Sequence, residues 1–201
     1  MSIDVVIDLS RYNGAVDFAR VKAARIAGVI GKATQGLDRI DPMFAANMAG
    51  AQAAGLLWGA YHFGVNADGA AQADYFLATA GHDVLHVLDY EPNRSDATTM
   101  TLDQAKAFVT RIHDVTGVWP GLYTGALARQ VLGGRKDPVL ANCWLWLAQY
   151  ASKASVPPTW STWTMWQYTD SGAVSGVPGH VDRSRFHGDL PALKRLWGVG
   201  R

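Results

Sequence analysis

Apolar runs of strand length alternate with amphipathic segments along the first two thirds of the chain. The first run, residues 5–10, is β-branched and stops at the turn residues 11–14, and residues 17–27 then carry apolar side chains near helical spacing. This order of strand, turn and helix recurs four times. The further strands are expected at 29–34, 57–63, 85–90 and 119–123, and their helices at 42–54, 67–80, 101–115 and 126–132.

Capping signals mark the ends of two of these helices. Asp41 stands before Pro42, an order that suits an N-cap and a first helical turn, and Gly55 stands where that helix should stop. Thr101 and Gln104 have the spacing of a capping box at the start of another helix. Both segments are therefore predicted to be helices with defined ends.

The alternation changes after residue 143. Three strands are expected at 144–150, 164–168 and 181–186, with prolines and glycines but little helical pattern between them. Eight strands, five of them followed by helices, indicate an α/β barrel that lacks its last helices. The alternative is an open doubly wound sheet. The amphipathic terminal segment 190–197 is expected to close the barrel.

Polar residues gather at the carboxyl ends of the expected strands, whereas the strand starts are mostly apolar. They are Asp8 in the first strand, Lys32, Thr34 and Gln35 in the second, Tyr61 and His62 in the third, Asp89 and Glu91 in the fourth, Tyr123 in the fifth, and Gln149, Gln167 and Asp182 late in, or just inside, the last three. Catalytic residues of α/β barrels collect at this end. We therefore expect one pocket on which four carboxylates converge.

Asp89 and Glu91 are two residues apart, so in a strand both side chains point to the same face. Crowding of two acids pushes their pKa values apart, so that one carboxyl can stay protonated while the other is ionised. Glycoside hydrolysis requires this division of roles. Taken alone, the pair is more typical of a solvated strand end before a proline turn; its position in the barrel favours a catalytic site.

Composition narrows the class of protein. The 201 residues are 49% hydrophobic and 17% charged, which suits one domain spanning 1–201, and the net charge of +1 gives no sign of a nucleic-acid partner. The sequence contains no uninterrupted apolar run of about 18 residues, so no membrane span or anchor is predicted. The single cysteine, Cys143, is expected to be a buried apolar residue. His62 is expected to be a hydrogen-bonded strand residue, because no zinc-ligand spacing accompanies it.

Together these segments resemble glycoside hydrolase family 25, the Chalaropsis-type lysozymes, over nearly the whole chain. The resemblance rests on the order and spacing of Asp8-Leu9-Ser10 with Asn13-Gly14, Gly31-Lys32-Ala33-Thr34-Gln35-Gly36, Gly59-Ala60-Tyr61-His62-Phe63, Leu88-Asp89-Tyr90-Glu91, Trp119 to Thr124, Leu145 to Tyr150, Trp166-Gln167-Tyr168 and Val181-Asp182. It implies a single-domain, flattened, modified TIM-like barrel, (β/α)5(β)3, with eight strands and about five helices. It also implies cleavage of the β-1,4 bond between N-acetylmuramic acid and N-acetylglucosamine, without a metal or cofactor.

By the same resemblance, Glu91 is the general acid/base and Asp8, Asp89 and Asp182 are the other catalytic carboxylates. The family favours retention by participation of the substrate's 2-acetamido group, with either Asp89 or Asp182 stabilising the intermediate. A direct carboxylate nucleophile is the competing mechanism. Substrate-binding residues are expected to be Tyr61, Tyr123, Gln149, Trp166, Gln167 and Lys32.

Two segments depart from the family pattern. Gln35 stands where the family more often has Glu, and Arg183-Ser184-Arg185 replaces a segment that usually contains Asn. Arg183 and Arg185 are therefore candidates to contact the acidic peptide or lactyl groups of peptidoglycan.

The expected function is that of a muramidase acting on the glycan strand of bacterial peptidoglycan, as a phage endolysin or a secreted antibacterial lysin. The alternatives are a non-catalytic peptidoglycan-binding barrel and, less favoured, a metal-dependent hydrolase using the acidic cluster. No signal peptide is visible at residues 1–8, so we expect synthesis in the cytoplasm and action on the cell wall after release or export. A monomer is expected.

Overall fold

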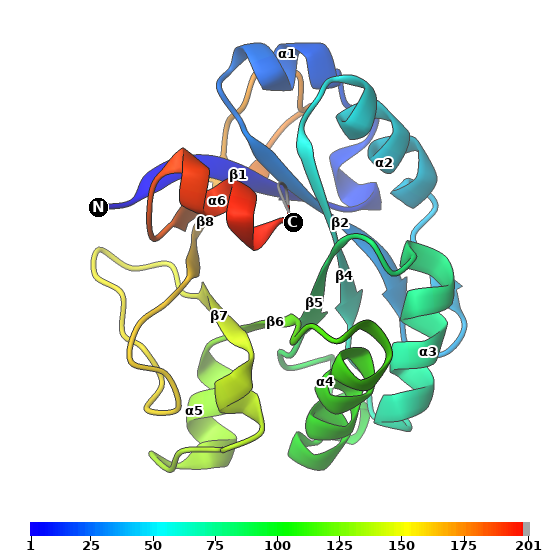
Figure 1. Cartoon of the computed structure of the whole chain (residues 1–201), viewed down its shortest axis with the longest axis vertical. Coiled ribbons are helices and arrows are strands. Elements are labelled where there is room, and N and C mark those ends of the chain that lie inside the picture. The colour runs from blue at the N-terminus through cyan, green and yellow to red at the C-terminus, as the bar shows by residue number, and fades with distance from the viewer. Residues whose placement is uncertain (199–201) are drawn as a thin grey trace.

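Eight strands close into a barrel in the computed structural model, which describes residues 1–198 (Figure 1). The strands are β1 (Ile3–Leu9), β2 (Gly28–Gln35), β4 (Leu57–Phe63), β5 (Leu85–Asp89), β6 (Gly121–Thr124), β7 (Trp144–Ala148), β8 (Met165–Gly172) and β9 (Val181–Phe186). They follow the order β1-β9-β8-β7-β6-β5-β4-β2, and pairing of β1 with β2 closes the ring. The expected eight-stranded barrel is thus confirmed, and the open sheet is excluded.

A short ninth strand, β3 (Arg39–Ile40), lies outside the ring and was not predicted. It pairs antiparallel with the end of β2, forming a hairpin that projects from the carboxyl end of the barrel. With two residues it is too short to leave a periodic signal in the sequence.

The last strand of the barrel runs in the opposite direction from the rest. Six neighbouring pairs are parallel, whereas β9 is antiparallel to both β8 and β1. Only residues 173–180 connect β8 to β9, which is too short for the crossover that a parallel pair needs. Because β9 runs backwards, its first residues lie at the carboxyl end of the other strands. Asp182 is therefore just inside the start of its strand, yet it lies at the same end of the barrel as the late residues of the parallel strands.

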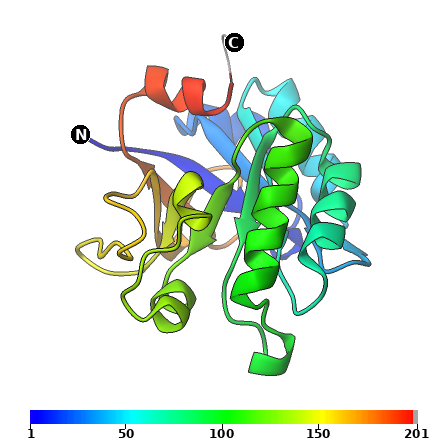
Figure 2. The same ribbon diagram turned by 60° about the horizontal axis from the view of Figure 1, so that its bottom comes forward.

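Six helices pack around the barrel. They are α1 (Phe18–Ala23), α2 (Phe44–Ala53), α3 (Gly69–Ala80), α4 (Leu102–Thr116), α5 (Ala126–Leu132) and α6 (Leu190–Leu196), with short 3-10 turns η1 (Arg11–Asn13), η2 (Asp96–Thr98) and η3 (Leu140–Asn142). The first five follow the expected strands. Figure 2 shows α6 across one end of the barrel, where the fully buried Leu193 packs with Val6 and Phe186. The terminal segment closes the barrel as predicted.

Of the two helices with capping signals, one begins as predicted and the other begins later, and a third helix ends earlier than predicted. Thr101 caps α4, and the reciprocal bond from Thr101 N–H to Gln104 completes the capping box. The helix predicted over 42–54 instead begins at Phe44, because Asp41 accepts the backbone N–H groups of Met43 and Arg11 and so organises the preceding turn. The helix predicted over 17–27 ends at Ala23, just before a residue in the left-handed region.

Two apolar layers hold the barrel together. Val6, Ile30 and Val87 point inward and fill its lower half, while Ile7 and Leu88, their neighbours in the strands, point outward against the helices. This alternation follows from the period of two in a strand. Cys143 is buried, as predicted, in the outer layer. Within residues 1–198, no helix is both long and apolar enough to cross a membrane.

A buried polar network fixes the end of β4 near the pocket. Gln72 of α3 is fully buried; its amide oxygen accepts from Val65 N–H and from His62 Nε2, and its amide nitrogen donates to the carbonyls of Val65 and Ala67. His62 Nδ1 in turn accepts from Thr34. Burial lowers the pKa of His62 to about 4. His62 is therefore a hydrogen-bonded strand residue, as predicted.

Replacing Gln72 should leave several buried backbone groups and His62 without partners. We expect Gln72→Met to lower the free energy of unfolding by about 3 kcal/mol, measured by urea denaturation. Gln52→Met, on the exposed face of α2, serves as the control and should change stability by less than about 0.5 kcal/mol. Equal effects of the two substitutions would show that the network does not support the fold.

Candidate active site

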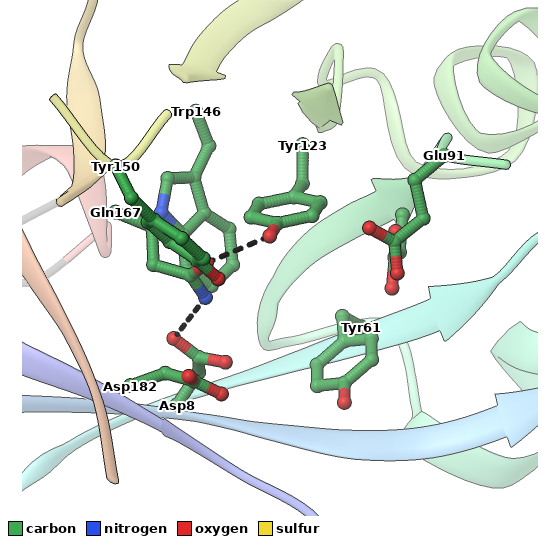
Figure 3. Close-up of a pocket in the computed structure, with 9 residues that line it drawn as sticks. Asp8, Tyr61, Glu91, Tyr123, Trp146, Tyr150, Gln167 and Asp182 are labelled. Carbon is green, nitrogen blue, oxygen red and sulfur yellow. Dashed lines mark hydrogen bonds between the residues drawn. The ribbon is translucent and has the colours of Figure 1, made fainter. Parts of the chain in front are cut away.

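A polar cavity of about 180 Å³ opens at the carboxyl end of the barrel (Figure 3). Its lining consists of Asp8, Tyr61, Asp89, Glu91, Tyr123, Trp146, Tyr150, Gln167 and Asp182. All four predicted carboxylates are thus brought together, along with three of the six residues predicted to bind substrate.

Strand register places these side chains at one level. Asp8 is the penultimate residue of β1, and Asp89, the last residue of β5, pairs with Phe63 on one side and Tyr123 on the other. Because side chains alternate along each strand, Asp8, Asp89 and Tyr123 all face the interior above the apolar layer. Glu91 lies two residues beyond Asp89 and points into the same cavity.

Asp8 and Asp182 form one acidic pair. They are register partners across β1 and β9, and their carboxyl groups share a hydrogen bond. Burial first, and then the charge of Asp182, raises the pKa of Asp8 well above its usual range, while a hydrogen bond from Gln167 opposes this rise. Burial also raises the pKa of Asp182 to about 6. The pair therefore retains a proton more readily than two separate aspartates would.

Gln167 connects this pair to two tyrosines. Its Nε2 donates to Asp8 Oδ2 at 2.9 Å, and its Oε1 accepts from the hydroxyls of Tyr123 at 2.7 Å and Tyr150 at 2.8 Å. The amide is thereby held in a single orientation. Trp146 packs edge-on against Tyr123 and donates to Ser184 at 2.9 Å. These contacts give the cavity a rigid aromatic wall.

Asp89 and Glu91 form a second acidic group. Figure 3 shows Glu91 across the cavity from Asp8 and Asp182, with the rings of Tyr61 and Tyr123 between them. Burial, followed by the charge of Glu91, raises the pKa of Asp89 well above its usual range. Burial also raises the pKa of Glu91, and Asp182 adds to this. Asp89 Oδ1 is buried without a hydrogen-bond partner.

Lys32 acts on this group from outside the cavity. Its Nζ donates to Gln35 at 2.9 Å and lies 4.8 Å from the centre of the Phe63 ring. Its positive charge lowers the pKa values of Glu91 and Asp89, opposing burial. Lys32 is thus placed to tune the carboxylates, although it does not line the cavity.

Trp166 and Gln149, which were expected to bind substrate, lie outside the cavity. Trp166 packs on the outer face of the barrel with Leu145 and Leu147 and donates to the Gln149 carbonyl at 2.6 Å. The Gln149 side chain accepts from Ser155 N–H and borders a neighbouring depression that Glu91 also lines. The alternation of a strand explains Trp166: if Gln167 faces inward, its neighbour faces outward.

Arg183 and Arg185, the candidates to contact the acidic groups of peptidoglycan, face away from the cavity. Arg183 pairs with Asp4 at 3.1 Å, and Arg185 stacks over the rings of Trp166 and Tyr168. Asp182, which precedes Arg183 in β9, has the opposite orientation and lines the cavity, as alternation requires.

Two lining residues were not assigned to the site from the sequence. Tyr150 follows the end of β7, a position that could have identified it, since strand ends collect functional side chains. Trp146 stands among alternating leucines, and nothing in that pattern separates a cavity wall from a core residue. Among the side chains that the structure describes, those of residues 1–198 except Asp96, no three His, Cys, Asp or Glu side chains are grouped to hold a metal ion.

Comparison with known proteins identifies the family. The family model described as glycosyl hydrolases family 25 matches residues 7–177. Lysozyme M1 of Streptomyces globisporus is 35% identical over 94% of this chain and 70% of that protein, and the N,O-diacetylmuramidase of a Chalaropsis species is 33% identical over 94% and 96%.

Solved structures agree with this result. The bacterial lysozyme of Streptomyces coelicolor superposes with a TM-score of 0.89 at 33% identity, covering 98% of both chains, and the muramidase of Acremonium alcalophilum with 0.86 at 33% identity, covering 99% and 100%. The protein is a glycoside hydrolase. It belongs to glycosyl hydrolases family 25, as the resemblance in its sequence implied.

The crowded acids should reduce stability at neutral pH. The pKa of Asp182 is about 6 in the folded state and about 3.9 in an unfolded chain, so the folded protein binds this proton more tightly and loses stability as pH rises from about 4 to 6. Asp182→Asn keeps a donor for Asp8 and removes the charge. We expect it to stabilise the protein by about 1 kcal/mol at pH 7.5, reduced by solvent screening, and to give no gain at pH 4.

Urea denaturation at both pH values measures this effect. Asp83→Asn removes an equivalent charge from an exposed position at the other end of the barrel and serves as the control. A gain that is the same at pH 4 and 7.5 would contradict the electrostatic explanation.

Proposed function

We propose that this glycoside hydrolase is a muramidase, which cleaves the β-1,4 bond between N-acetylmuramic acid and N-acetylglucosamine in bacterial peptidoglycan. The observation that carries the proposal is the convergence of Asp8, Asp89, Glu91 and Asp182 on one cavity. The names of the relatives, lysozyme and N,O-diacetylmuramidase, agree with this substrate. A non-catalytic barrel is disfavoured, because binding a largely neutral sugar gives no reason to crowd four acids whose raised pKa values destabilise the fold.

Glu91 is the proposed general acid. Burial raises its pKa, so that it holds a proton when substrate binds, and its side chain enters the cavity from beyond the strand end. It donates this proton to the glycosidic oxygen as the bond to the anomeric carbon breaks. The resulting carboxylate then takes a proton from the water that attacks the same carbon in the second step.

The substrate's own 2-acetamido oxygen is the proposed nucleophile. It attacks the anomeric carbon as the leaving group departs, forming an oxazolinium ion, and water later opens this ring with overall retention. Asp89 is favoured over Asp182 as the group that stabilises the positive charge. Asp89 Oδ1 has no partner and can accept the acetamido N–H, whereas Asp182 already shares a hydrogen bond with Asp8. A covalent glycosyl adduct trapped on either aspartate would contradict participation.

Asp89 and Glu91 are proposed to take the roles of anion and proton donor by sharing a single proton. The charge of Glu91 raises the pKa of Asp89, so the pair favours a state in which only one of the two is ionised. A proton on Glu91 leaves Asp89 as the anion that the oxazolinium requires. Tyr61, Tyr123 and Gln167 are the proposed contacts for the sugar; burial raises the pKa values of both tyrosines, which therefore remain neutral.

The biological setting belongs to the same proposal. A muramidase made in the cytoplasm acts on the wall only after release or export, which fits a phage endolysin or a secreted antibacterial lysin. We propose that it acts as a monomer.

Glu91→Gln should abolish hydrolysis. The amide has nearly the same shape but cannot donate an acidic proton, so we expect the release of new reducing ends from purified peptidoglycan to fall by about 10³-fold or more. The assay is run with EDTA, and mass spectrometry of the fragments identifies the sugar that carries the new end. Asp83→Asn is the matched control and should retain full activity.

Three outcomes of this assay would count against the proposal. Full activity in Glu91→Gln would remove the assignment of the acid. Loss of wild-type activity in EDTA would favour a metal-dependent hydrolase. Absence of any wild-type hydrolysis, with peptidoglycan still bound, would favour the non-catalytic barrel.

Lys32 should set the pH range of activity. Its charge lowers the pKa values of Glu91 and Asp89, so Lys32→Gln should raise both. Glu91 would then stay protonated to higher pH, and Asp89 would ionise at higher pH. We expect both limbs of the pH profile of kcat/KM to move in the alkaline direction. Lys136→Gln, an exposed lysine on another face, should leave the profile unchanged, and an unmoved profile in Lys32→Gln would exclude this role.

A further inference from the structure

A groove of about 750 Å³ lies beside the cavity at the same end of the barrel. Its walls are the η1 turn with Arg11 and Tyr12, the hairpin of β2 and β3 with Arg39, and the segment after Glu91 with Arg94. Lys32 lies on its floor. We call this feature the basic groove.

The basic groove gathers positive charge in a chain that is nearly neutral. Four cations line it, whereas the described acidic side chains on its walls and in the adjoining recess are Asp38 and Asp41. Asp38 is 84% exposed and lies 3.9 Å from Arg39, a contact too weak and too solvated to neutralise it. Asp41 is occupied by two backbone N–H groups. The net charge of the whole chain is only +1, so this is a local concentration.

These cations act on a common point. Arg11 donates to the Tyr12 hydroxyl at 3.0 Å, and the charges of Arg11, Lys32 and Arg94 all lower the pKa of that hydroxyl. Tyr12 is 81% exposed, so the point lies on the surface and is open to a ligand. A carboxylate placed there would be stabilised by the same three cations that favour the phenolate.

The groove is within reach of the reacting bond. Arg94 is three residues from Glu91, so the two Cα atoms are at most about 11 Å apart. A muramic acid residue carries a peptide on its lactyl group, and four extended residues of such a peptide span about 13 Å. A peptide that starts from a sugar in the cavity can therefore enter the groove.

We propose that the basic groove binds the carboxylates of the stem peptide carried by the muramic acid residue whose bond is cleaved. The proposal rests on the muramidase function, and it identifies the stem peptide as the part of the substrate that determines which glycan strands the enzyme prefers. Arg11, Arg39 and Arg94 form ion pairs with free carboxylates of the peptide, and Lys32 joins the groove to the catalytic carboxylates. The enzyme therefore prefers glycan strands that carry acidic stems to strands without peptides.

The test uses the variant R11Q/R39Q/R94Q and two soluble substrates free of wall polymers: strands with stem peptides, and the same strands stripped by an amidase. On peptide-bearing strands we expect kcat/KM to fall by about tenfold, as when three exposed ion pairs are lost together. On stripped strands the change should stay below about twofold. The difference between wild type and variant should also shrink as salt rises.

The control variant K136Q/K153Q/K194Q removes the same charge from exposed positions that do not line the groove. It should cleave both substrates as the wild type does. Peptide-bearing strands whose carboxylates have been converted to amides provide the complementary measurement: the wild type should slow by about tenfold on them, and the groove variant should not slow further.

Each remaining result is decisive. Equal losses on both substrates, or a loss in the control variant, would show a general effect of charge or folding and overturn the proposal. Untreated walls are assayed in parallel, and a loss seen on them but on neither soluble substrate would assign the groove to the phosphates of a wall polymer instead. If the wild type releases no reducing ends from either substrate, the muramidase function fails, a result distinct from failure of the groove.

Discussion

The antiparallel pairing of β9 with β1 is the constraint on which the site depends. It closes the barrel, and it turns the start of β9 toward the end where the parallel strands finish. Asp182 thereby comes to lie directly across from Asp8, although 174 positions separate them in the chain. Like charges opposite each other normally destabilise a strand pair. Here a shared proton and the Gln167 amide offset part of that repulsion, and the raised pKa values record what remains.

The repulsion becomes useful because the two acidic groups differ in their partners. Asp8 is held by Gln167 and Asp182, whereas Asp89 keeps an oxygen free and Glu91 extends into the cavity from beyond a strand. Glu91 is also the only glutamate among the 201 residues. All other acidic residues are aspartates, so the longer side chain occurs at the position beyond a strand end from which Glu91 points into the cavity.

The fold could be predicted well from the sequence because each strand and helix carries a local signal: β-branched runs, helical spacing and the capping box of Thr101. The errors concern the direction of a strand and the face to which a side chain points, not whether a strand or helix is present. The direction of β9 depends on the short link from β8, and it is this reversed direction that brings the start of the strand, with Asp182, to the carboxyl end of the others. Facing was predictable in principle: once Gln167 and Asp182 face inward, Trp166 and Arg183 must face outward. Tyr150 and the hairpin at β3 lie in irregular segments, whose conformation depends on contacts distant in sequence.

The two ends of the barrel differ: one is closed by apolar packing, and the other holds the polar cavity. At one end α6 inserts Leu193 among inward-facing residues, so that burial of apolar surface holds the barrel shut. At the other end apolar closure is absent, and acids, tyrosines and Gln167 occupy the interior. The crowded carboxylates lower the stability of the fold, and the apolar packing in the rest of the barrel offsets that loss. Arg11, Arg39 and Arg94 lie beside them on the η1 turn, on the hairpin outside the ring and on a loop, and they do not line the cavity of the acids. Lys32 lines the groove, and its charge also lowers the pKa values of Asp89 and Glu91. One side chain therefore influences both the acids of the cavity and the electrostatic field at the groove.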